Sequence, residues 1–565
     1  MSKWFFFITL TFPFIIEGLG IRFIRDDIGY YYLFLPIILF FIPERKKEIH
    51  WPVWPTLFFG LFIFFSLVSS LFFAVDKQLA FEKTLFYLAS YLIFIFFYNQ
   101  KDRAKKYLSV TVFLGTGIFI VIFLAFKLFF TRWVGNSLIT GSEYNFIAAL
   151  HGEHNHLGDF LGITLIYLLF SFFKTKKRSL LAVFLLVFYF FLISFSRSAY
   201  WAFIIVMIML TFLRNKELIF GFLKLERLII FFTIIATVCL TVFVSINRHS
   251  YYFDKEIKPY LITTLSSRLN YWQQAKDSIV QRPFFGVGPG NFGSLSNHYR
   301  QQPNDWTDTA HNIFLQILAE NGGLAFVGFA LFILIIVVSA VKNFSLYSLL
   351  FFYLLFNFQT DYTYQIYSFF IFFMIVTGLI YEEKKPRNNE LVYGLLSILI
   401  TFVLVRILIS DAFLMAKLPV PSLHFYPLNK FSYQKLITEE QKRGNYATVM
   451  KEAASYEKKF AEEPLTLNFL SRLYENYNEK STALSLYEKI YSLDPFVSFE
   501  TIKKIYLLKK EVRSTEEAKR FIKAVLKNYQ EKIPSWQREQ YYQKQIEEFC
   551  QKEKETECEE LNWDD

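Results

Sequence analysis

Polar residues that can do chemistry gather in four short segments of this chain, each beside a long apolar run. The segments are residues 151–158, 196–201, 268–292 and 311–323. Arginine side chains hold anionic groups through paired hydrogen bonds, and a histidine whose pKa is near neutrality accepts a proton. Together these residue types predict chemistry on an anionic substrate in which one group gives up a proton.

Arg197 lies at a polar junction between two apolar runs, just beyond a stretch of Phe, Leu and Ile. Because a cation near hydrocarbon is costly, Arg197 is expected either to pair with an anionic group or to extend to lipid headgroups. Arg268 shares a helical face with Tyr271 and Trp272, which predicts an amphipathic helix at the membrane surface. Both arginines are therefore candidates for holding an anion.

His311 stands where a polar loop enters the next apolar helix, so it is expected at the water boundary. A near-neutral imidazole there can accept a proton, although a histidine that only caps a helix has the same pattern. Asn312, Gln316 and Glu320 recur every four residues and therefore share one face of that helix. Polar residues on a membrane helix usually face a cavity or the bundle interior, so this stripe is expected to support a site.

A glycine-rich turn with Gly286, Gly288 and Gly290 lies between Arg268 and His311. Glycine has no side chain, so its backbone can approach a ligand closely, and Gly288 and Gly290 are candidate supporting residues. An ordinary loop has the same composition, and that alternative stays open.

Three histidines, His151, His154 and His156, occur within six residues around Asn155. Closely spaced histidines occur in metal sites, but this spacing is a weaker signal than paired cysteines or an H-E-x-x-H motif. A polar rim over the site is the favoured interpretation, with Asn155 and His156 as supporting residues and no metal.

The composition indicates that membrane helices position these segments. Of the 565 residues, 54% are hydrophobic and 20% aromatic, with 71 Phe and 35 Tyr, which exceeds the usage of soluble cores. The apolar runs are apolar all round rather than striped, and in lipid only helices suit them. We expect an all-α fold, a polytopic bundle of about 12–13 spans, at residues 4–19, 29–43, 53–74, 84–98, 107–130, 157–173, 179–195, 198–213, 228–246, 322–341, 344–357, 364–381 and 391–410.

Lysine and arginine cluster in short loops that all fall on one side of this arrangement. The loops are residues 44–47, 101–106, 174–178, 214–216 and 384–387. Since short cytoplasmic loops are rich in these residues, the N-terminus is expected in the cytoplasm and the C-terminal part on the outer side of the membrane. No small-residue cleavage site follows the first span, so that span is expected to remain as a helix.

Four regions follow from these patterns. They are an N-terminal transmembrane bundle (1–246), a periplasmic loop carrying active-site elements (247–311), C-terminal transmembrane helices (312–410) and a periplasmic helical domain (411–565). The last region has 25 Lys and Arg against 26 Asp and Glu, so the net charge of +11 belongs to the membrane part. This distribution argues against nucleic-acid binding.

The C-terminal region contains one segment that resembles a tetratricopeptide repeat. The matching positions are Pro464, Leu467, Leu470, Tyr474, Ala483, Tyr487 and Pro495. Because one repeat cannot bury its own apolar face, stacked helix pairs are expected, with a generic helical domain as the alternative. Cys550 and Cys558 near the end would be permitted to form a disulfide outside the cell, but their spacing does not establish one.

The order of these motifs resembles the O-antigen ligase and Wzy-type polymerase superfamily. The resemblance rests on Asn155-His156-Leu157-Gly158, Ser196-Arg197-Ser198-Ala199, Arg268 with Trp272, the segment 283–292, and His311-Asn312 with Gln316, Glu320 and Gly322. It covers residues of about 145 to 380 and depends on the order and placement of the motifs more than on any single one.

The resemblance implies a GT-C-like bundle that acts on a glycan carried by undecaprenyl diphosphate, without a metal or other cofactor. It further implies that Arg197 and Arg268 hold the diphosphate and that His311 is the essential histidine. The implied acceptor is lipid A core or another glycan. The bundle would also contact membrane lipids, and the C-terminal domain would bind a protein partner or the acceptor.

Several functions stay open at this point. An O-antigen ligase is favoured, followed by a polysaccharide polymerase and a protein O-oligosaccharyltransferase, which differ only in the acceptor. A transporter of lipid-linked glycan would be expected to carry charges inside its spans, and these spans have almost none. A membrane-anchored scaffold would need far fewer helices than this chain contains.

Overall fold

The computed structural model describes most of the chain and is almost entirely helical. The described residues are 49–102, 104–105, 154–194, 196–212, 232–233, 235–237, 239, 264–383, 387–533, 542 and 544–553. Three expected spans, 4–19, 29–43 and 107–130, lie outside these residues, and so does most of 228–246. Cys550 lies in a described helix without a described side chain, and Cys558 lies outside.

Nine of the expected spans coincide with apolar helices. These are α3 (Val53–Val68), continued by a π-helical turn (Ser69–Phe73), α4 (Lys77–Asn99), α7 (His154–Thr175), α8 (Arg178–Ile193), α9 (Arg197–Phe212), α15 (Ile313–Lys342), α16 (Leu346–Asn357), α17 (Tyr367–Ile380) and α18 (Glu390–Met415). Five segments of the described residues are long and apolar enough to cross a membrane: Val53–Phe73, Lys77–Asn99, Asn155–Thr175, Ile313–Lys342 and Glu390–Met415. The prediction of an all-α polytopic membrane protein is confirmed.

The bundle buries a largely aromatic core. α3 packs along α15, and α4 packs along α17. Phe59 on α3 is fully buried between Tyr91 of α4 and Phe332 of α15, with ring centroids 4.8 and 4.9 Å away. Aromatic contacts of this kind add to the burial energy of the rings, which explains how a phenylalanine-rich chain reaches one packed arrangement.

One end of the bundle holds the described parts of two expected basic loops, 101–106 and 384–387. The short strands β1 (His50–Trp51) and β2 (Arg387–Asn388) pair there in antiparallel fashion. The backbone N–H of Val53 donates to Glu383 at 2.7 Å, and Lys101 donates to the carbonyl of Tyr381. The ends of α3, α4, α17 and α18 therefore meet on the same side, as the charge pattern predicts. Which side of the membrane this end faces stays a prediction.

The opposite end carries the polar loop and the C-terminal domain. The loop contains α13 (Thr264–Gln281), α14 (Phe292–Tyr299) and a 3-10 turn (Pro303–Asp305). The C-terminal helices are α19 (Pro419–Phe425), α20 (Lys430–Lys442), α21 (Tyr446–Lys459), α22 (Pro464–Asn476), α23 (Lys480–Leu493), α24 (Phe499–Val512), α25 (Thr515–Lys532) and α27 (Lys544–Glu553). α18 continues to Met415, and the division of the chain into four regions stays a prediction.

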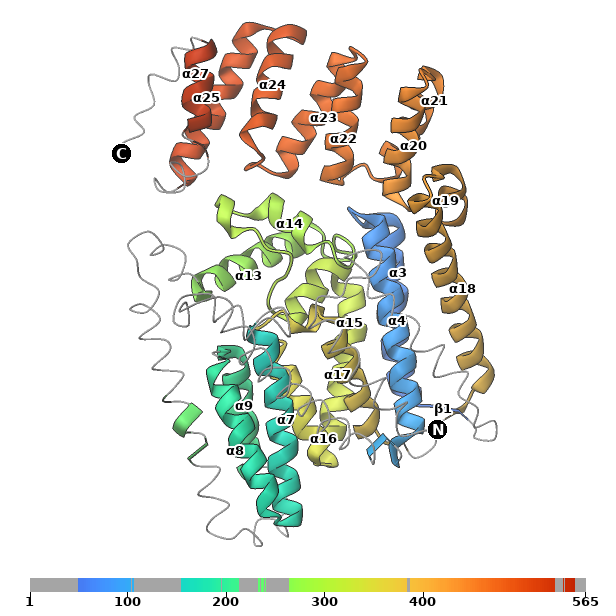
Figure 1. Ribbon diagram of the computed structural model, residues 1–565, viewed down its shortest axis with the longest axis vertical. Helices are drawn as coiled ribbons and strands as arrows, with labels where there is room; N and C mark the ends of the chain where they lie inside the picture. The colour runs from blue at the N-terminus through green and yellow to red at the C-terminus, as the bar shows by residue number, and fades with distance from the viewer. Residues whose placement is uncertain are drawn as a thin grey trace, which may run out of the picture.

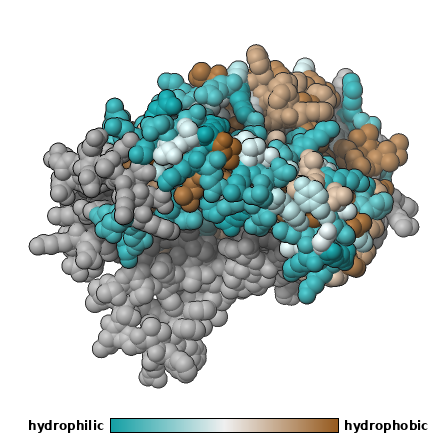
Figure 2. Space-filling view, turned by 90° about the horizontal axis from the view of Figure 1, so that it is seen from above, coloured by the Kyte–Doolittle hydropathy of each residue, from teal (hydrophilic) through white to brown (hydrophobic). Residues whose placement is uncertain are grey.

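The C-terminal helices form successive pairs, α20 with α21, α22 with α23 and α24 with α25, stacked across the top of Figure 1. Leu467, Leu470, Ala483 and Tyr487, which occupy the repeat positions, are buried in the core between these pairs. The stacked pairs agree with the expectation of helical repeats, and the assignment to the tetratricopeptide family stays a prediction. Seen from above, the exposed face is mainly hydrophilic, with smaller hydrophobic patches (Figure 2).

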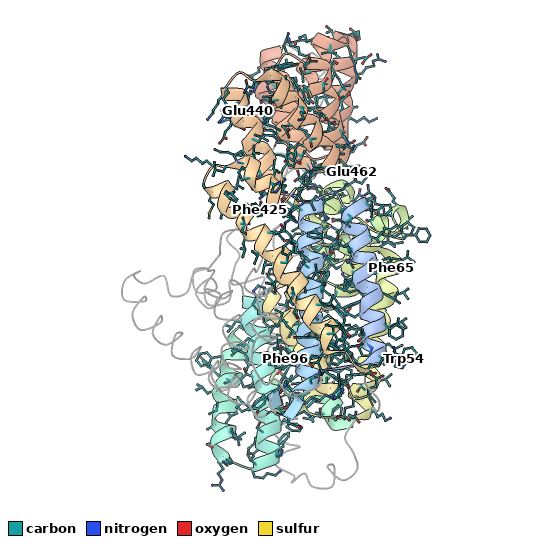
Figure 3. The ribbon with its side chains drawn as sticks, turned by 90° about the vertical axis from the view of Figure 1, so that its right-hand side faces the viewer. Trp54, Phe65, Phe96, Phe425, Glu440 and Glu462 are labelled. Carbon is teal, nitrogen blue, oxygen red and sulfur yellow. The ribbon has the colours of Figure 1, made fainter. Side chains whose placement is uncertain are left out.

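Ion pairs fasten this domain to the bundle. Arg300 contacts Asp494 at 2.6 Å, and Lys430 contacts Asp76 at 2.6 Å. Glu462 lies at the junction in Figure 3, where Arg282 reaches it at 2.9 Å, whereas Trp54 marks the far end of α3. The three contacts hold the domain over the end of the bundle that carries the polar loop.

Candidate active site

The candidate site lies at the end of the bundle beneath the C-terminal domain. The first turns of α7, α9 and α15 meet there with α13 and with the connection 358–366 between α16 and α17 (Figure 1). The candidate residues that the structure describes are carried by these elements, by His311 and Asn312 just before α15, or by the glycine turn beside them. Helices that cross the whole bundle thus set the positions of side chains at their ends.

The backbone of His311 adopts a left-handed conformation with a φ of 51°. The side chain of Asn312 caps α15 by accepting the N–H groups of Phe314 and Leu315 at 3.0 and 3.1 Å. Upstream, the indole N–H of Trp272 donates to the carbonyl of Ala310 at 3.0 Å. Left-handed residues other than glycine are uncommon and are found at functional sites when their surroundings hold them. Here the bonds of Asn312 and Trp272 fix the backbone on both sides of His311.

Aromatic rings enclose the imidazole of His311. Tyr271 stacks on it at 5.5 Å, and Tyr362 meets it edge-on at 5.3 Å between centroids. Nδ1 of His311 is buried and has no hydrogen-bond partner among the described residues. Buried polar atoms are normally paired, so an unpaired one in a site marks a position for a ligand atom or water.

The electrostatic surroundings keep this imidazole neutral. Burial and, as the smaller cause, the positive charge of Arg268 together lower the pKa of His311 to about 4. At neutral pH the ring is therefore unprotonated in the empty site and has a nitrogen lone pair to offer.

His156 joins the same cluster through Tyr362. Its ring meets that of Tyr362 edge-on at 5.3 Å, so Tyr362 lies between the two histidines. Asn155 precedes His156 in the first turn of α7 and is partly exposed. The segment 151–158 and the segment 311–323, far apart in the chain, are thus brought to one place.

The two arginines approach this cluster from different helices. Arg268 on α13 is partly buried, and burial lowers the pKa of its guanidinium while the nearby charge of Asp361 opposes that change. Arg197 is the first residue of α9, and its neighbour Ser198 donates to Oδ2 of Asp361 at 2.6 Å. Asp361 therefore links the start of α9 with the environment of Arg268.

Asp361 is a site residue that the motif analysis missed. Its carboxylate is fully buried and accepts the N–H of Tyr362 at 2.7 Å on Oδ1. Deeper in the bundle, Asn357 links to Asp159 on α7 at 2.5 Å. The sequence signal that could have indicated Asp361 is the polar stretch 359–365 between two apolar runs. That stretch contains no motif like those of the other four segments.

Gln316 and Glu320 face the interior, but they bind other parts of the chain. Oε1 of Gln316 accepts the N–H of Ala310 at 2.6 Å and the hydroxyl of Tyr364 at 3.0 Å. The amide of Gln316 donates to Oε1 of Glu320 at 2.6 Å, and the N–H of Phe292 donates to the same oxygen at 3.1 Å. These bonds tie α15 to the loop that contains His311 and to the end of the glycine turn.

The glycine turn packs closely against other segments of the protein, and the expectation that Gly288 and Gly290 let backbone approach a ligand stays a prediction. Gly288 has a φ of 97°, its N–H donates to the carbonyl of Glu320 at 2.8 Å, and a Cβ on it would lie 2.4 Å from Cβ of Ala74. A Cβ on Gly290 would lie 3.1 Å from Leu79. The missing side chains allow these chain segments to pack closely together.

The same turn explains where α15 really begins. The expected span starts at residue 322, whereas the helix starts at Ile313 and kinks at Gly322, whose φ is 81°. A Cβ on Gly322 would lie 2.2 Å from the carbonyl oxygen of Phe284. The part of α15 that precedes Gly322 therefore helps to hold the candidate site in place.

No three His, Cys, Asp or Glu side chains within the described residues converge as a metal-binding group. His151 lies outside the described residues, and so does the side chain of His154. His156, the described member of the histidine cluster, contacts aromatic rings.

Comparison with known proteins adds an independent finding. Residues 181–333 match the family model described as O-Antigen ligase. The matched segment runs from α8 into α15 and contains Arg197, Arg268 and His311. No curated protein and no solved structure matches the chain. The match, on a bundle of apolar helices that is consistent with it, shows an O-antigen ligase domain at residues 181–333 and supports the O-antigen ligase superfamily.

Proposed function

We propose that this protein transfers a glycan from undecaprenyl diphosphate to an acceptor hydroxyl at the periplasmic face of the bacterial inner membrane, as an O-antigen ligase does. The observation that carries the proposal is the placement of His311. Its unpaired, buried Nδ1 lies in one cluster with Arg268, and Asp361 connects that cluster to the start of α9 at Arg197.

In this proposal the arginines serve the leaving group. The lipid diphosphate leaves the anomeric carbon of the sugar readily once the negative charge that develops on the bridging oxygen is neutralised. Arg197 and Arg268 supply that neutralisation through charge-assisted hydrogen bonds, which gain strength in a partly dry site. Asp361 balances the positive charge of Arg268 while the site is empty.

His311 serves the acceptor. The acceptor oxygen forms a bond to the anomeric carbon while the bond from that carbon to the diphosphate oxygen breaks and the electron pair leaves with the diphosphate. The acceptor proton passes to the imidazole, and the single displacement inverts the anomeric centre. Since the charge of Arg268 lowers the pKa of His311, a bound diphosphate would raise that pKa and make the ring a better base when the donor is present.

The acceptor decides between a ligase, a polymerase and a protein O-oligosaccharyltransferase. We favour lipid A core, with a second lipid-linked glycan and a protein hydroxyl as the alternatives. Stacked helix pairs fastened directly above the site support a role for the C-terminal domain in bringing the acceptor or a partner protein to it. In the proposed orientation the N-terminus is cytoplasmic and this domain is periplasmic.

The test is a transfer assay with purified protein in nanodiscs. An undecaprenyl diphosphate-linked oligosaccharide is supplied with lipid A core, with a second lipid-linked repeat, or with a serine- and threonine-containing peptide. Arg197→Ala and His311→Ala run in parallel with Arg472→Ala and His424→Ala, which change exposed residues of the C-terminal domain.

Product on one acceptor, lost in the two site variants and kept in the two controls, supports the proposal and names the acceptor. Product that survives in His311→Ala removes the proposed base. Well-folded protein that yields no product on any acceptor contradicts the proposed donor or acceptor class.

A further inference from the structure

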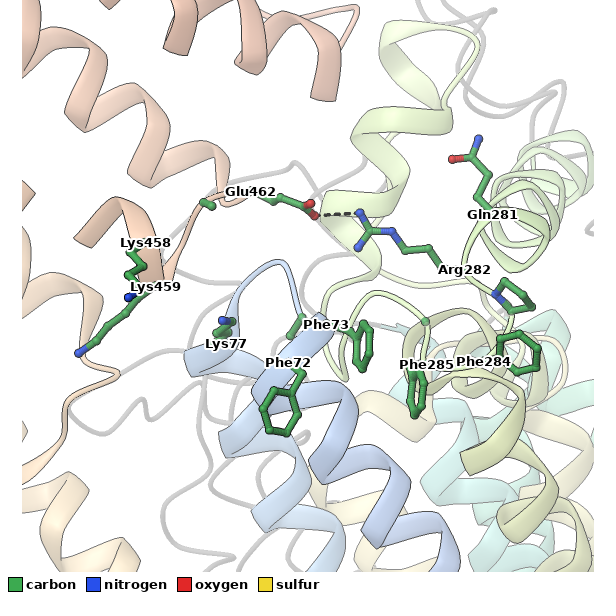
Figure 4. Close-up of a pocket in the computed structure, with 14 residues that line it drawn as sticks. Phe72, Phe73, Lys77, Gln281, Arg282, Phe284, Phe285, Lys458, Lys459 and Glu462 are labelled. Carbon is green, nitrogen blue, oxygen red and sulfur yellow. Dashed lines mark hydrogen bonds and ion pairs between the residues drawn. The ribbon is translucent and has the colours of Figure 1, made fainter. Parts of the chain in front are cut away.

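A second cavity lies away from the candidate active site, at the seam between the bundle and the C-terminal domain. It measures about 490 Å³, a size typical of small-molecule sites. Figure 4 shows its two walls: phenyl rings from the ends of the membrane elements on one side, and charged residues of the C-terminal domain on the other. Nothing in the transfer chemistry uses these residues.

The wall on the bundle side is aromatic. Phe72 and Phe73 come from the last turn of the span Val53–Phe73, and Phe284 and Phe285 come from the glycine-turn loop. Phe73 and Phe285 stack at 4.4 Å, whereas Phe72 and Phe284 are 71% and 63% exposed. Because Phe72 and Phe284 are exposed at the boundary of a membrane span, they favour contact with lipid chains rather than with water.

The remaining charged residues of the lining are mostly cationic. They are Lys77, Arg282, Lys458 and Lys459, against the single carboxylate of Glu462. Arg282 is paired with Glu462 at 2.9 Å, and Lys459 donates to the carbonyl of Pro427 at 3.1 Å. Lys77 and Lys458 have no ion-pair partner among the described residues, so the cavity holds uncompensated positive charge.

An apolar path leads to the cavity along α3. The exposed large apolar side chains of that helix and of the turn after it recur at helical spacing on the outside of the bundle: Trp54, Leu57, Leu61, Phe64, Leu71 and Phe72. A lipid whose acyl chains lie on this stripe would place its headgroup in the cavity, between the phenyl rings and the lysines.

We propose that the seam cavity binds a membrane lipid with an anionic phosphate headgroup. The acyl chains lie along the exposed stripe of α3, and Lys77 and Lys458 contact the phosphate. A zwitterionic lipid would bring a second positive charge to an already cationic cavity, and a soluble anion would gain nothing from the phenyl rings. The bound lipid would connect the bundle and the C-terminal domain.

Lipid binding to the full chain, measured by native mass spectrometry of protein in detergent, tests this proposal without any transfer reaction. Phosphatidylglycerol, phosphatidylethanolamine and soluble glycerol phosphate are titrated separately. Lys77→Gln/Lys458→Gln removes the two unpaired cations, and Lys442→Gln/Lys451→Gln removes the same charge from other positions on the chain. Phe72→Ser is compared with Phe402→Ser, which changes an equally accessible ring on α18.

We expect phosphatidylglycerol to bind at least tenfold more tightly than phosphatidylethanolamine, and Lys77→Gln/Lys458→Gln to weaken its binding by roughly tenfold or more. The lysine control keeps native affinity, and Phe72→Ser weakens the lipid but not glycerol phosphate. Equal binding of the two lipids, or equal loss in the control variants, overturns the proposal. Glycerol phosphate that binds as tightly as the lipid indicates a soluble-anion site and overturns it as well.

Discussion

Two regions at the same end of the bundle use similar residue types in opposite ways. Around His311, aromatic rings and charged groups enclose a nitrogen without a partner. Around the glycine turn, only two helical turns further along α15, Gln316 and Glu320 are bound to backbone and side chains of the loop. The polar residues at this end therefore fall into two groups: His311, which we propose faces the substrate, and Gln316 and Glu320, which tie α15 to the loop that carries it.

The largest effect is expected from His311→Ala. Removing a proposed general base lowers the transfer rate by about a thousandfold, within the usual range of such residues, while thermal unfolding stays almost unchanged because the ring makes no described side-chain hydrogen bond. Initial rates and unfolding curves in detergent measure the two properties. His298→Ala, an exposed histidine of α14, is the control, and a His311→Ala rate within about threefold of native would contradict the assignment.

The next effect concerns Arg268→Gln. Loss of a charge-assisted contact to the leaving group lowers the rate by about a hundredfold. Because the positive charge of Arg268 depresses the pKa of His311, its removal raises that pKa from about 4 toward the ordinary value near 6.5. Burial, the larger cause, remains, so the shift is partial.

The pH dependence of kcat/KM measures this change. Activity falls as pH drops through the pKa of the base, so the acid limb should lie at higher pH in Arg268→Gln than in the native protein. Arg472→Gln, which is exposed on the C-terminal domain, should leave both rate and limb unchanged. If the acid limb of Arg268→Gln lies at the same pH as that of the native protein, Arg268 does not lower the pKa of the base.

Gly288→Ala tests the other region. A Cβ there meets Ala74 at 2.4 Å on a backbone with positive φ, so the unfolding free energy should drop by about 1 to 3 kcal/mol. Gly444→Ala is the matched control, since its φ is 74° with open space around it, and it should cost only the conformational part of about 1 kcal/mol. Thermal unfolding compares the two. Equal losses would show that close packing of the turn contributes nothing.

The smallest effect on stability and rate is expected at Asn312, which lies between His311 and the first turn of α15. Asn312→Ala removes the cap of α15 and should cost about 1 kcal/mol of stability, with a loss of rate below tenfold because His311 loses part of its support. Asn312→Ser keeps a capping oxygen and should restore both properties. A rate loss in Asn312→Ala as large as that of His311→Ala would place Asn312 among the residues that contact substrate.

Much of the fold followed from hydropathy alone. Nine apolar runs coincide with helices because lipid offers no partner to backbone N–H and C=O groups, and a helix pairs these groups within the segment. The boundaries were less secure: α15 starts at Ile313 rather than 322, because Gly322 kinks the helix against Phe284 instead of beginning it. A hydropathy pattern predicts the apolar part of such a helix but does not detect its polar first turns.

The site was partly predictable for a related reason. Arg268 and His311 stand out because charge and imidazole are rare beside apolar runs, and the structure places them together. Asp361 was missed because a short polar connection carries many such residues without chemical consequence. The family match was expected from motif order and is confirmed over residues 181–333.

The amino-acid sequence by itself determined the membrane character, the helical class and the resemblance to O-antigen ligases, because these depend on composition and on local patterns. Only the tertiary structure decided which polar residues share a space. Tyr362 between two histidines, Asp361 beside Ser198, and the glycines packed on Ala74 and Leu79 join segments far apart in the chain. Such contacts depend on how helices pack across the whole bundle, and no local pattern of residues records that packing.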